Sequence, residues 1–163
     1  MSHINYPGEK MYLIQSAVIK GDQNVGKLKE CFKVQSIDYE SGRSTVQAKL
    51  NSNTRSFGGL NYSPIRLTKE ICKVSAALQD HCSFGMPNDC KIYCLDSNST
   101  EYLEIALKNA SFSNYQFKAH GGMPTETFDI SYSAITIRHT PRNEKGLPGT
   151  PVSTGYNLSE LKR

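Results

Sequence analysis

Alternating apolar and polar positions run through most of the chain and predict β-strands. The clearest case is a stretch of about forty residues, 100–141, which keeps one hydrophobic face along its length. Leu103, Ile105 and Leu107 show the period of two that is typical of a strand with one buried face. A glycine-containing break at 120–124 separates this strand from a second long one. We expect the two strands to pair with each other.

The second long strand, 128–137, changes the phase of its alternation near Ser133. Its apolar residues are, in order, Phe128, Ile130, Tyr132, Ile135 and Ile137. A one-residue shift moves every later side chain to the opposite face of a strand. The change therefore predicts either a bulge or a strand that serves two apolar environments in turn.

Three shorter strands are predicted in the N-terminal half of the chain, over 10–20, 28–39 and 64–68. A polar turn at 21–24 separates the first two. The stretch 42–61 is rich in Ser, Asn, Thr, Arg and Gly, and it is longer than a hairpin loop. It predicts a long extended loop, and loops of that length inside a domain are usually functional or disordered.

One substantial helix is predicted after the third N-terminal strand. Ser75 is placed to cap it, good helix formers follow, and Gly85 ends it. Val74, Leu78 and Cys82 recur at intervals of four residues, so they form one stripe that faces a core.

The length of the chain, 163 residues and 18.1 kDa, suits one domain over 1–163 with a substantial core. The segment 142–163 begins with a proline- and glycine-containing run of low apolar content, and we expect it to be a surface tail. The net charge of +4 comes from 19 basic and 15 acidic residues spread along the sequence, which argues against nucleic-acid binding. No apolar run approaches the roughly 18 residues of a membrane helix, and the N-terminus lacks an export-signal pattern. We therefore expect a soluble protein made in the cytoplasm.

Five cysteines form an odd set at irregular spacing, which suits reduced, buried thiols better than a disulfide framework. They are Cys31, Cys72, Cys82, Cys90 and Cys94. His81 with three of them, Cys82, Cys90 and Cys94, could supply four zinc ligands, yet no pair has the two-residue spacing that zinc sites normally use. On a strand, Cys90 and Cys94 share one face with Ile92 and are more simply core residues. We expect no metal and no cofactor.

The residues that could carry chemistry form no catalytic constellation. The four histidines are far apart in the sequence. Glu101, Glu104 and Glu126 stand singly on strands or turns, where solvent exposure is the norm for a carboxylate. No glycine-rich phosphate loop, Gly-x-Ser-x-Gly elbow or His-Glu-x-x-His stretch occurs. We therefore expect no catalytic site and a protein that is not an enzyme.

Several short stretches are specific when they are taken together and in order. Thr68-Lys69-Glu70 leads through Ser75 into the leucine-bearing helix. Further on, Glu101-Tyr102-Leu103 is followed by Pro124-Thr125-Glu126. In this order the chain resembles the haemolysin-coregulated protein (Hcp) family, the tube subunit of the bacterial type VI secretion system. The resemblance runs from about Phe32 to the C-terminus.

The chain departs from the family pattern at several positions and is a divergent member. The family often has tryptophan at the positions of Tyr39 and Ile137, tyrosine at His139, an acidic residue at Cys72 and proline at Ala76. Contacts within a ring and with cargo are therefore not carried over residue by residue.

The resemblance implies a mainly β fold: a β-barrel of two packed antiparallel sheets with one flanking α-helix and a long extended loop. It also implies a structural tube subunit whose copies form hexameric rings, which stack into a tube that a contractile sheath propels. A spike protein and effector proteins are the further partners, and the tube is secreted by the type VI system without a signal peptide. Neither nucleic-acid binding nor membrane insertion is implied.

The extended loop is the expected contact with an adjacent subunit or ring. The candidate residues for this contact are Arg43, Asn53, Arg55, Phe57, Gly58 and Gly59. Two alternatives remain open: a monomeric all-β domain that binds a ligand or partner, and a phage tail tube-like protein with similar ring behaviour. The size of the purified protein separates a monomeric domain from a ring-forming subunit.

Overall fold

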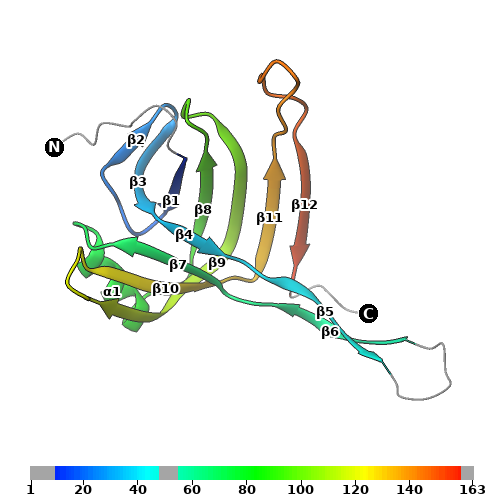
Figure 1. Ribbon diagram of the computed structural model, residues 1–163. Coiled ribbons are helices and arrows are strands. Elements are labelled where there is room, and N and C mark those ends of the chain that lie inside the picture. The colour runs from blue at the N-terminus through cyan, green and yellow to red at the C-terminus, as the bar shows by residue number, and fades with distance from the viewer. Residues whose placement is uncertain (1–9, 48–54, 159–163) are drawn as a thin grey trace.

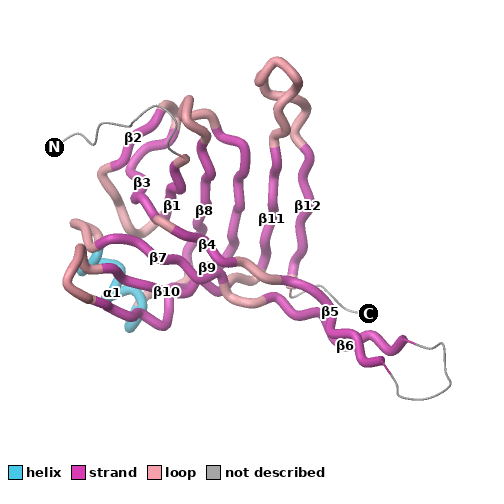
Figure 2. Tube along the Cα trace, viewed as in Figure 1, coloured by secondary structure: helices cyan, strands magenta, loops and turns pink. Residues whose placement is uncertain are grey.

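The described part of the chain folds mainly into β-strands, with one helix at an edge of the molecule (Figure 1, Figure 2). The structure is a computed structural model that describes residues 10–47 and 55–158, and for residues 43–47 and 55–61 it describes the backbone alone. The elements in chain order are β1 (Met11–Ser16), β2 (Gln23–Val25), β3 (Leu28–Val34), β4 (Ser36–Asp38), β5 (Ser41–Gln47), β6 (Arg55–Tyr62), β7 (Ile65–Glu70), α1 (Ser75–Phe84), β8 (Asn88–Leu95), β9 (Glu101–Lys118), β10 (Thr125–Ser131), β11 (Ala134–His139) and β12 (Val152–Asn157). The predicted class, mainly β with one flanking α-helix, is confirmed.

Ten of the strands form one antiparallel sheet. Its order is β2-β3-β1-β8-β9-β10-β7-β4, with β11 paired to β9 and β12 paired to β11. In Figure 1, β4, β7 and β10 run across β1, β8 and β9, so the sheet folds over into two layers around a common core. Within the described residues the end strands β2 and β4 are not paired with each other. The expected barrel is therefore an open, folded-over sheet.

The core lies between the two layers. Its fully buried members include Ile14, Phe32, Leu67, Ile92 and Phe128. Leu13, which precedes Ile14, is also fully buried, but it belongs to a smaller cluster with Tyr93. Neighbouring strand residues point to opposite faces, so β1 is covered on both faces. This explains why its sequence is a continuous apolar run.

Two asparagines bend the long strand β9 from one layer into the other. Asn109 and Asn114 have φ angles of 48° and 51°, a left-handed conformation that asparagine tolerates better than most residues. At each position the pairing register shifts by one residue, as in a β-bulge. Residues 103–108 of β9 pair with β11, and residues 111–118 pair with β10. β9 therefore contributes to both layers.

The predicted phase change in the last long strand is confirmed. The stretch is two strands, β10 and β11, with Ser133 between them, and both pair with β9. The amide of Ser133 donates to the carbonyl of Lys108 (3.0 Å), and the side-chain amide of Asn109 donates to Ser133 Oγ (3.1 Å). The interruption of this strand thus lies opposite the bulge at Asn109.

The structure corrects three predictions in the N-terminal half. The predicted strand 28–39 is two strands, β3 and β4, which pair with β1 and β7 and meet at Gln35. β2 begins inside the predicted turn 21–24. The stretch 42–61, expected as a loop, largely forms the hairpin β5–β6. Its asparagines and glycines are depleted in strands generally, and they weaken the alternating pattern.

α1 begins at the predicted serine, but this serine does not cap it. Val74 occupies the cap position without a side-chain hydrogen bond, and Ser75 Oγ instead accepts a hydrogen bond from the amide of Cys72 (2.9 Å). The predicted apolar stripe is confirmed, because Val74 and Leu78 are buried and Cys82 is half-buried against the core.

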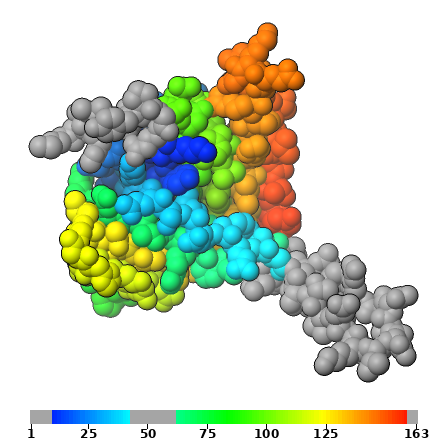
Figure 3. Space-filling model, in the orientation of Figure 1, coloured from blue at the N-terminus to red at the C-terminus, as the bar shows by residue number. Residues whose placement is uncertain are grey.

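The C-terminal segment, expected as a surface tail, contains the strand β12. It lies along one flank of the molecule with β11, in orange and red (Figure 3). Most of its side chains are exposed, but Tyr156 packs against Tyr62 with ring centroids 5.5 Å apart, and Leu158 contacts the core. An ion pair between Arg142 and Asp96 joins the preceding loop to the β8–β9 turn. The single-domain organisation stays a prediction.

Candidate assembly surface

The hairpin β5–β6 is a separate two-stranded sheet that projects from the body of the molecule (Figure 1). Its strands pair from Ser41 and Tyr62 at the root to Gln47 and Arg55 at the far end of the described part. A strand of seven residues spans roughly 23 Å. The far end of the hairpin is thus distant from the core, and another molecule can contact it there.

Five of the six predicted contact residues lie on this hairpin. Arg43 is on β5 near the root, whereas Arg55 and Phe57 are on β6. The sixth, Asn53, falls outside the described residues. The structure therefore brings the predicted residues onto two paired strands, and their role in contacts stays a prediction.

The two predicted glycines form part of a β-bulge in the hairpin. The register shifts between Arg43 and Thr45, so that Gly58 and Gly59 together lie opposite the single residue Ser44. A bulge of this kind bends and twists a hairpin. The bulge therefore gives a structural reason for glycine at these two positions, independent of any contact with another molecule.

A hollow of about 460 Å³ lies at the root of the hairpin, where β4 leads into β5 and β6 leads into β7. It is lined by Asp38, Tyr39, Glu40, Ser63, Pro64 and Arg66. Arg66 is bound to Asp129, with Nε 2.9 Å from Oδ1. Burial alone would raise the pKa of Asp129, but hydrogen bonds from Arg66 and Asn114 and the charge of Arg66 lower this pKa overall. Asp38 and Glu40 are exposed and have no ion-pair partner among the described residues.

An apolar groove of about 510 Å³ adjoins this hollow, and Tyr39 lines both. The other residues of the groove are Tyr12, Gln35, Ser36, Ile37, Cys94, Tyr102, Leu103, Ile105 and Ile137. Burial raises the pKa of the Tyr102 hydroxyl, and its neighbours Cys94 and Tyr12 raise it further. Every described residue that lines the groove is uncharged at neutral pH. The groove therefore suits apolar and hydrogen-bonded contacts, whereas the hollow beside it is acidic.

Two of the short stretches that carry the family resemblance meet in a buried polar network. Lys69 on β7 and Glu126 on β10 are partners in the strand register, are fully buried and form an ion pair. The hydroxyl of Ser75 donates to Glu126 Oε1 (2.8 Å), and that of Tyr115 donates to Oε2 (2.6 Å). Burial and the charge-bearing carboxylate raise the pKa of Tyr115. The network joins three strands to the start of α1.

The expectation that Glu126 is a solvent-exposed carboxylate is wrong. The two stretches are more than fifty positions apart in the sequence, since Lys69 and Glu126 are separated by 57 residues. Only the pairing of β7 with β10 brings them together. A charged residue at an inward strand position on each stretch is the one sequence signal that could have indicated the pair.

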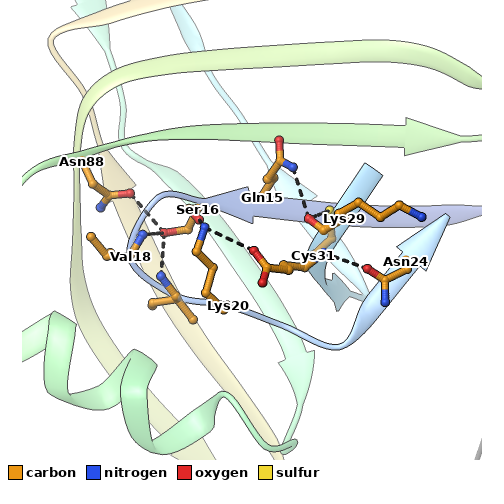
Figure 4. Close-up of polar contacts among 10 residues, drawn as sticks. Gln15, Ser16, Val18, Lys20, Asn24, Lys29, Cys31 and Asn88 are labelled. Atoms are coloured by element: carbon orange, nitrogen blue, oxygen red, sulfur yellow. Dashed lines mark hydrogen bonds and ion pairs between the residues drawn. The ribbon is translucent and has the colours of Figure 1, made fainter. Parts of the chain in front are cut away.

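A smaller polar cluster anchors the loop after β1 (Figure 4). Ser16 Oγ donates to Asn88 Oδ1 (3.1 Å) and accepts hydrogen bonds from the amides of Val18 and Ile19 (3.1 Å each). Ser16 and Asn88 are buried, so the loop is attached to the start of β8. Val18 is exposed in this anchored loop and offers an apolar contact at the surface.

Comparison with known proteins decides the family. The family model described as "Type VI secretion system effector, Hcp" matches residues 8–139, which is most of the chain. The chain belongs to the Hcp family. Hcp is a secreted, structural protein of type VI secretion. A search of curated proteins finds no match.

Solved structures share the Hcp fold with this chain. A type six secretion system protein aligns with a TM-score of 0.85 at 20% identity, covering 94% of this chain and 99% of that one. Hcp1 from Salmonella typhimurium aligns with a TM-score of 0.71 at 15% identity, covering 92% and 95%. A type VI secretion system effector from Yersinia pestis aligns with a TM-score of 0.67 at 16% identity, covering 90% and 98%. At these identities the likeness shows the fold.

The cysteines of this Hcp protein are free, and most are shielded. Burial raises the pKa of Cys90 to about 12, and that of Cys82 and of Cys94 to about 11. Cys31 is buried, and Cys72 is exposed, contrary to the expectation that the thiols are buried. Within residues 10–47 and 55–158, no group of three or more His, Cys, Asp or Glu could hold a metal ion. The described part of the chain also contains no helix that is long and apolar enough to cross a membrane.

Proposed function

We propose that this chain is a structural tube subunit. Its copies form hexameric rings, and the rings stack into a tube that a contractile sheath propels, with a spike protein at the tip and effector proteins as cargo. Membership of the Hcp family supports the proposal. The observation that carries it is the projecting hairpin, because a two-stranded sheet that extends beyond the main sheet leaves backbone edges that another molecule can cover.

The open sheet supplies further surfaces for contacts between copies. β2, β4 and β12 are end strands, and such strands have unpaired backbone groups on one side that another chain can cover. A head-to-tail contact between different surfaces of identical subunits closes into a ring when the rotation allows it. Edges, groove and hairpin together offer the distinct surfaces that such a contact needs.

The remaining features of the proposal follow from a mechanical role. The subunit needs no catalytic residue, metal or cofactor, and its work consists of rigid contacts. It is made as one domain in the bacterial cytoplasm and leaves through the type VI system without a signal peptide. Its partners are other copies, the spike, the sheath and effectors, with no nucleic acid and no insertion into a membrane.

The size of the purified protein tests the proposal. Light scattering coupled to size exclusion under reducing conditions is expected to give a particle of six subunits, and electron microscopy is expected to show rings. A strict monomer at every concentration would instead support a monomeric all-β binding domain. A phage tail tube-like protein gives the same rings, so co-purification with a type VI spike or sheath separates these two functions.

Deletion of residues 52–59 tests the hairpin itself. Because residues 55–59 lie outside the main sheet, the shortened chain is expected to fold, with a far-UV circular dichroism spectrum that loses only the contribution of the hairpin. It is expected to remain monomeric under conditions in which the full chain forms rings. Rings and tubes made by the shortened protein would remove the hairpin from the assembly contact.

A further inference from the structure

The charge of the hairpin differs from that of the rest of the chain. Residues 41–62 contain three basic residues, Arg43, Lys49 and Arg55, and no aspartate or glutamate. This short segment thus carries three of the four net positive charges of the protein. Basic residues are dispersed when they are counted along the chain, but the hairpin lacks the acidic residues that balance them elsewhere.

The hollow at the root of the hairpin has the opposite charge. Asp38 and Glu40 lie on either side of the half-buried Tyr39, and both are exposed. Among the residues whose side chains the structure describes, Arg66 is the one basic residue that lines the hollow, and its guanidinium forms the ion pair with Asp129. The described residues of the hollow therefore carry a net negative charge, from Asp38 and Glu40.

Basic residues at the far end of the hairpin cannot neutralise the acidic hollow at the root of the same hairpin. Arg55 is opposite Gln47, six residues along β5 from Ser41 at the root. Six residues of strand correspond to roughly 20 Å, which exceeds the reach of an ion pair. A basic residue at the far end thus meets an acidic hollow of this kind only in another copy.

We propose that the hollow at the hairpin root receives the basic hairpin of a second copy of this chain. Asp38 and Glu40 pair with basic residues of the incoming hairpin, Arg55 foremost, and the neutral groove beside the hollow takes its apolar contacts. The inference rests on the proposed tube function and names the receiving surface. Root and hairpin are different surfaces, so the contact is head-to-tail and repeats from copy to copy.

Charge reversal on each side of the contact tests the inference. The root variant carries Asp38→Lys and Glu40→Lys, and the hairpin variant carries Lys49→Glu and Arg55→Glu, which are away from the root in the sequence. In each variant alone, the hairpin and the hollow of neighbouring copies have the same sign of charge. Since like charges across an interface repel each other, assembly of either variant is expected to be weaker by roughly ten-fold or more. Sedimentation velocity of the full chain measures the assembled fraction against protein concentration.

An equimolar mixture of the two variants is the decisive sample. The acidic hairpin of the hairpin variant then meets the basic root of the root variant. The basic hairpin of the root variant meets the acidic root of the hairpin variant. Alternating copies therefore restore attraction at every contact, and assembly is expected to return to within about three-fold of the wild type. A contact within one chain could not be restored by mixing.

Two charge reversals elsewhere serve as matched controls. Asp80→Lys on α1 and Lys27→Glu in the β2–β3 turn change exposed residues away from the root. Both are expected to assemble like the wild type, and circular dichroism confirms that every variant is folded. Higher salt is expected to weaken wild-type assembly, because surface charge attraction is screened.

The outcomes separate the inference from the proposed function. A wild-type chain that never assembles contradicts the proposed function itself. If the wild type assembles and the root variant assembles equally well, or if mixing restores nothing, the receiving surface is elsewhere and this inference is overturned. Loss in each variant with recovery in the mixture supports it.

Discussion

The buried pair of Lys69 and Glu126 shows how single side chains affect the stability of this fold. Removing two charges from water is costly, and the cost is offset only where the geometry is good and the remaining polar atoms are hydrogen-bonded. Here Ser75 and Tyr115 occupy the two oxygens of the carboxylate, and Lys69 also donates to the carbonyl of Glu70 (2.8 Å). The network therefore links α1 to the sheet by polar bonds, besides the apolar contact of the helix.

Lys69→Met is expected to lower the free energy of unfolding by about 3–5 kcal/mol, because it leaves a buried carboxylate without its cation. Glu126→Gln is expected to act similarly by leaving the ammonium group unpaired. The double variant is expected to lose clearly less than the sum of the two, since no uncompensated charge remains. Urea denaturation of the four proteins measures this coupling, and strictly additive losses would show that the pair is not coupled.

Thiol reactivity gives a second test at the scale of single residues. Thiols with a pKa of about 11, as for Cys82 and Cys94, have only about one molecule in a thousand as thiolate at pH 8. Cys72 is exposed at the surface. One thiol of the native protein is therefore expected to react rapidly with an aromatic disulfide reagent, and Cys72→Ser is expected to abolish that phase. A rapid phase of two or more thiols would contradict the burial of the others.

Among the elements, β9 shows best what an alternating pattern can and cannot predict. The period of two predicted the strands and the phase change of the last long one, because buried faces impose that period. The two bulges at Asn109 and Asn114 depend on backbone conformation, which apolar spacing reveals only as a shift of phase. The hairpin β5–β6 was expected as a loop because its sequence is rich in asparagine, serine and glycine and carries no strong apolar alternation.

The bulge at Asn109 can be tested by substitution. A β-branched residue is costly in the left-handed region, so Asn109→Val is expected to lower stability by about 1–2 kcal/mol. Glycine adopts this conformation freely, and Asn109→Gly is the matched control that loses only the hydrogen bond to Ser133 (3.1 Å). Thermal unfolding of both variants compares them. Equal losses would mean that the side-chain hydrogen bond, and not the backbone conformation, determines the choice of asparagine.

For the molecule as a whole, the candidate site was predictable in part. The hairpin segment could be selected from its composition, and its lack of acidic residues is visible in the sequence. The hollow was not predictable, because it depends on the pairing of β4 with β7 and on the ion pair that engages Arg66 across to β10. The relation between the open sheet, the acidic root and the basic hairpin is visible only in the structure, because it depends on strands that are distant in the sequence.

The C-terminal segment allows a test of the whole architecture, because a surface tail and a sheet strand predict opposite effects of its removal. Without residues 142–158, β11 becomes an unpaired edge, and the chain loses the contacts of Tyr156 and Leu158 and the ion pair of Arg142 with Asp96. Loss of about 2–3 kcal/mol corresponds to a fall in melting temperature of about 5–10 °C for a domain of this size.

Ending the chain at Pro141 is therefore expected to lower the melting temperature by that amount and to increase aggregation through the new edge of β11. The double variant Tyr156→Ser and Leu158→Ala keeps the strand but removes its apolar contacts, and its melting temperature is expected to lie between those of the wild type and the truncated chain. Differential scanning calorimetry and light scattering make the comparison. An unchanged melting temperature in the truncated protein would mean that β12 adds nothing to the sheet and behaves as a tail.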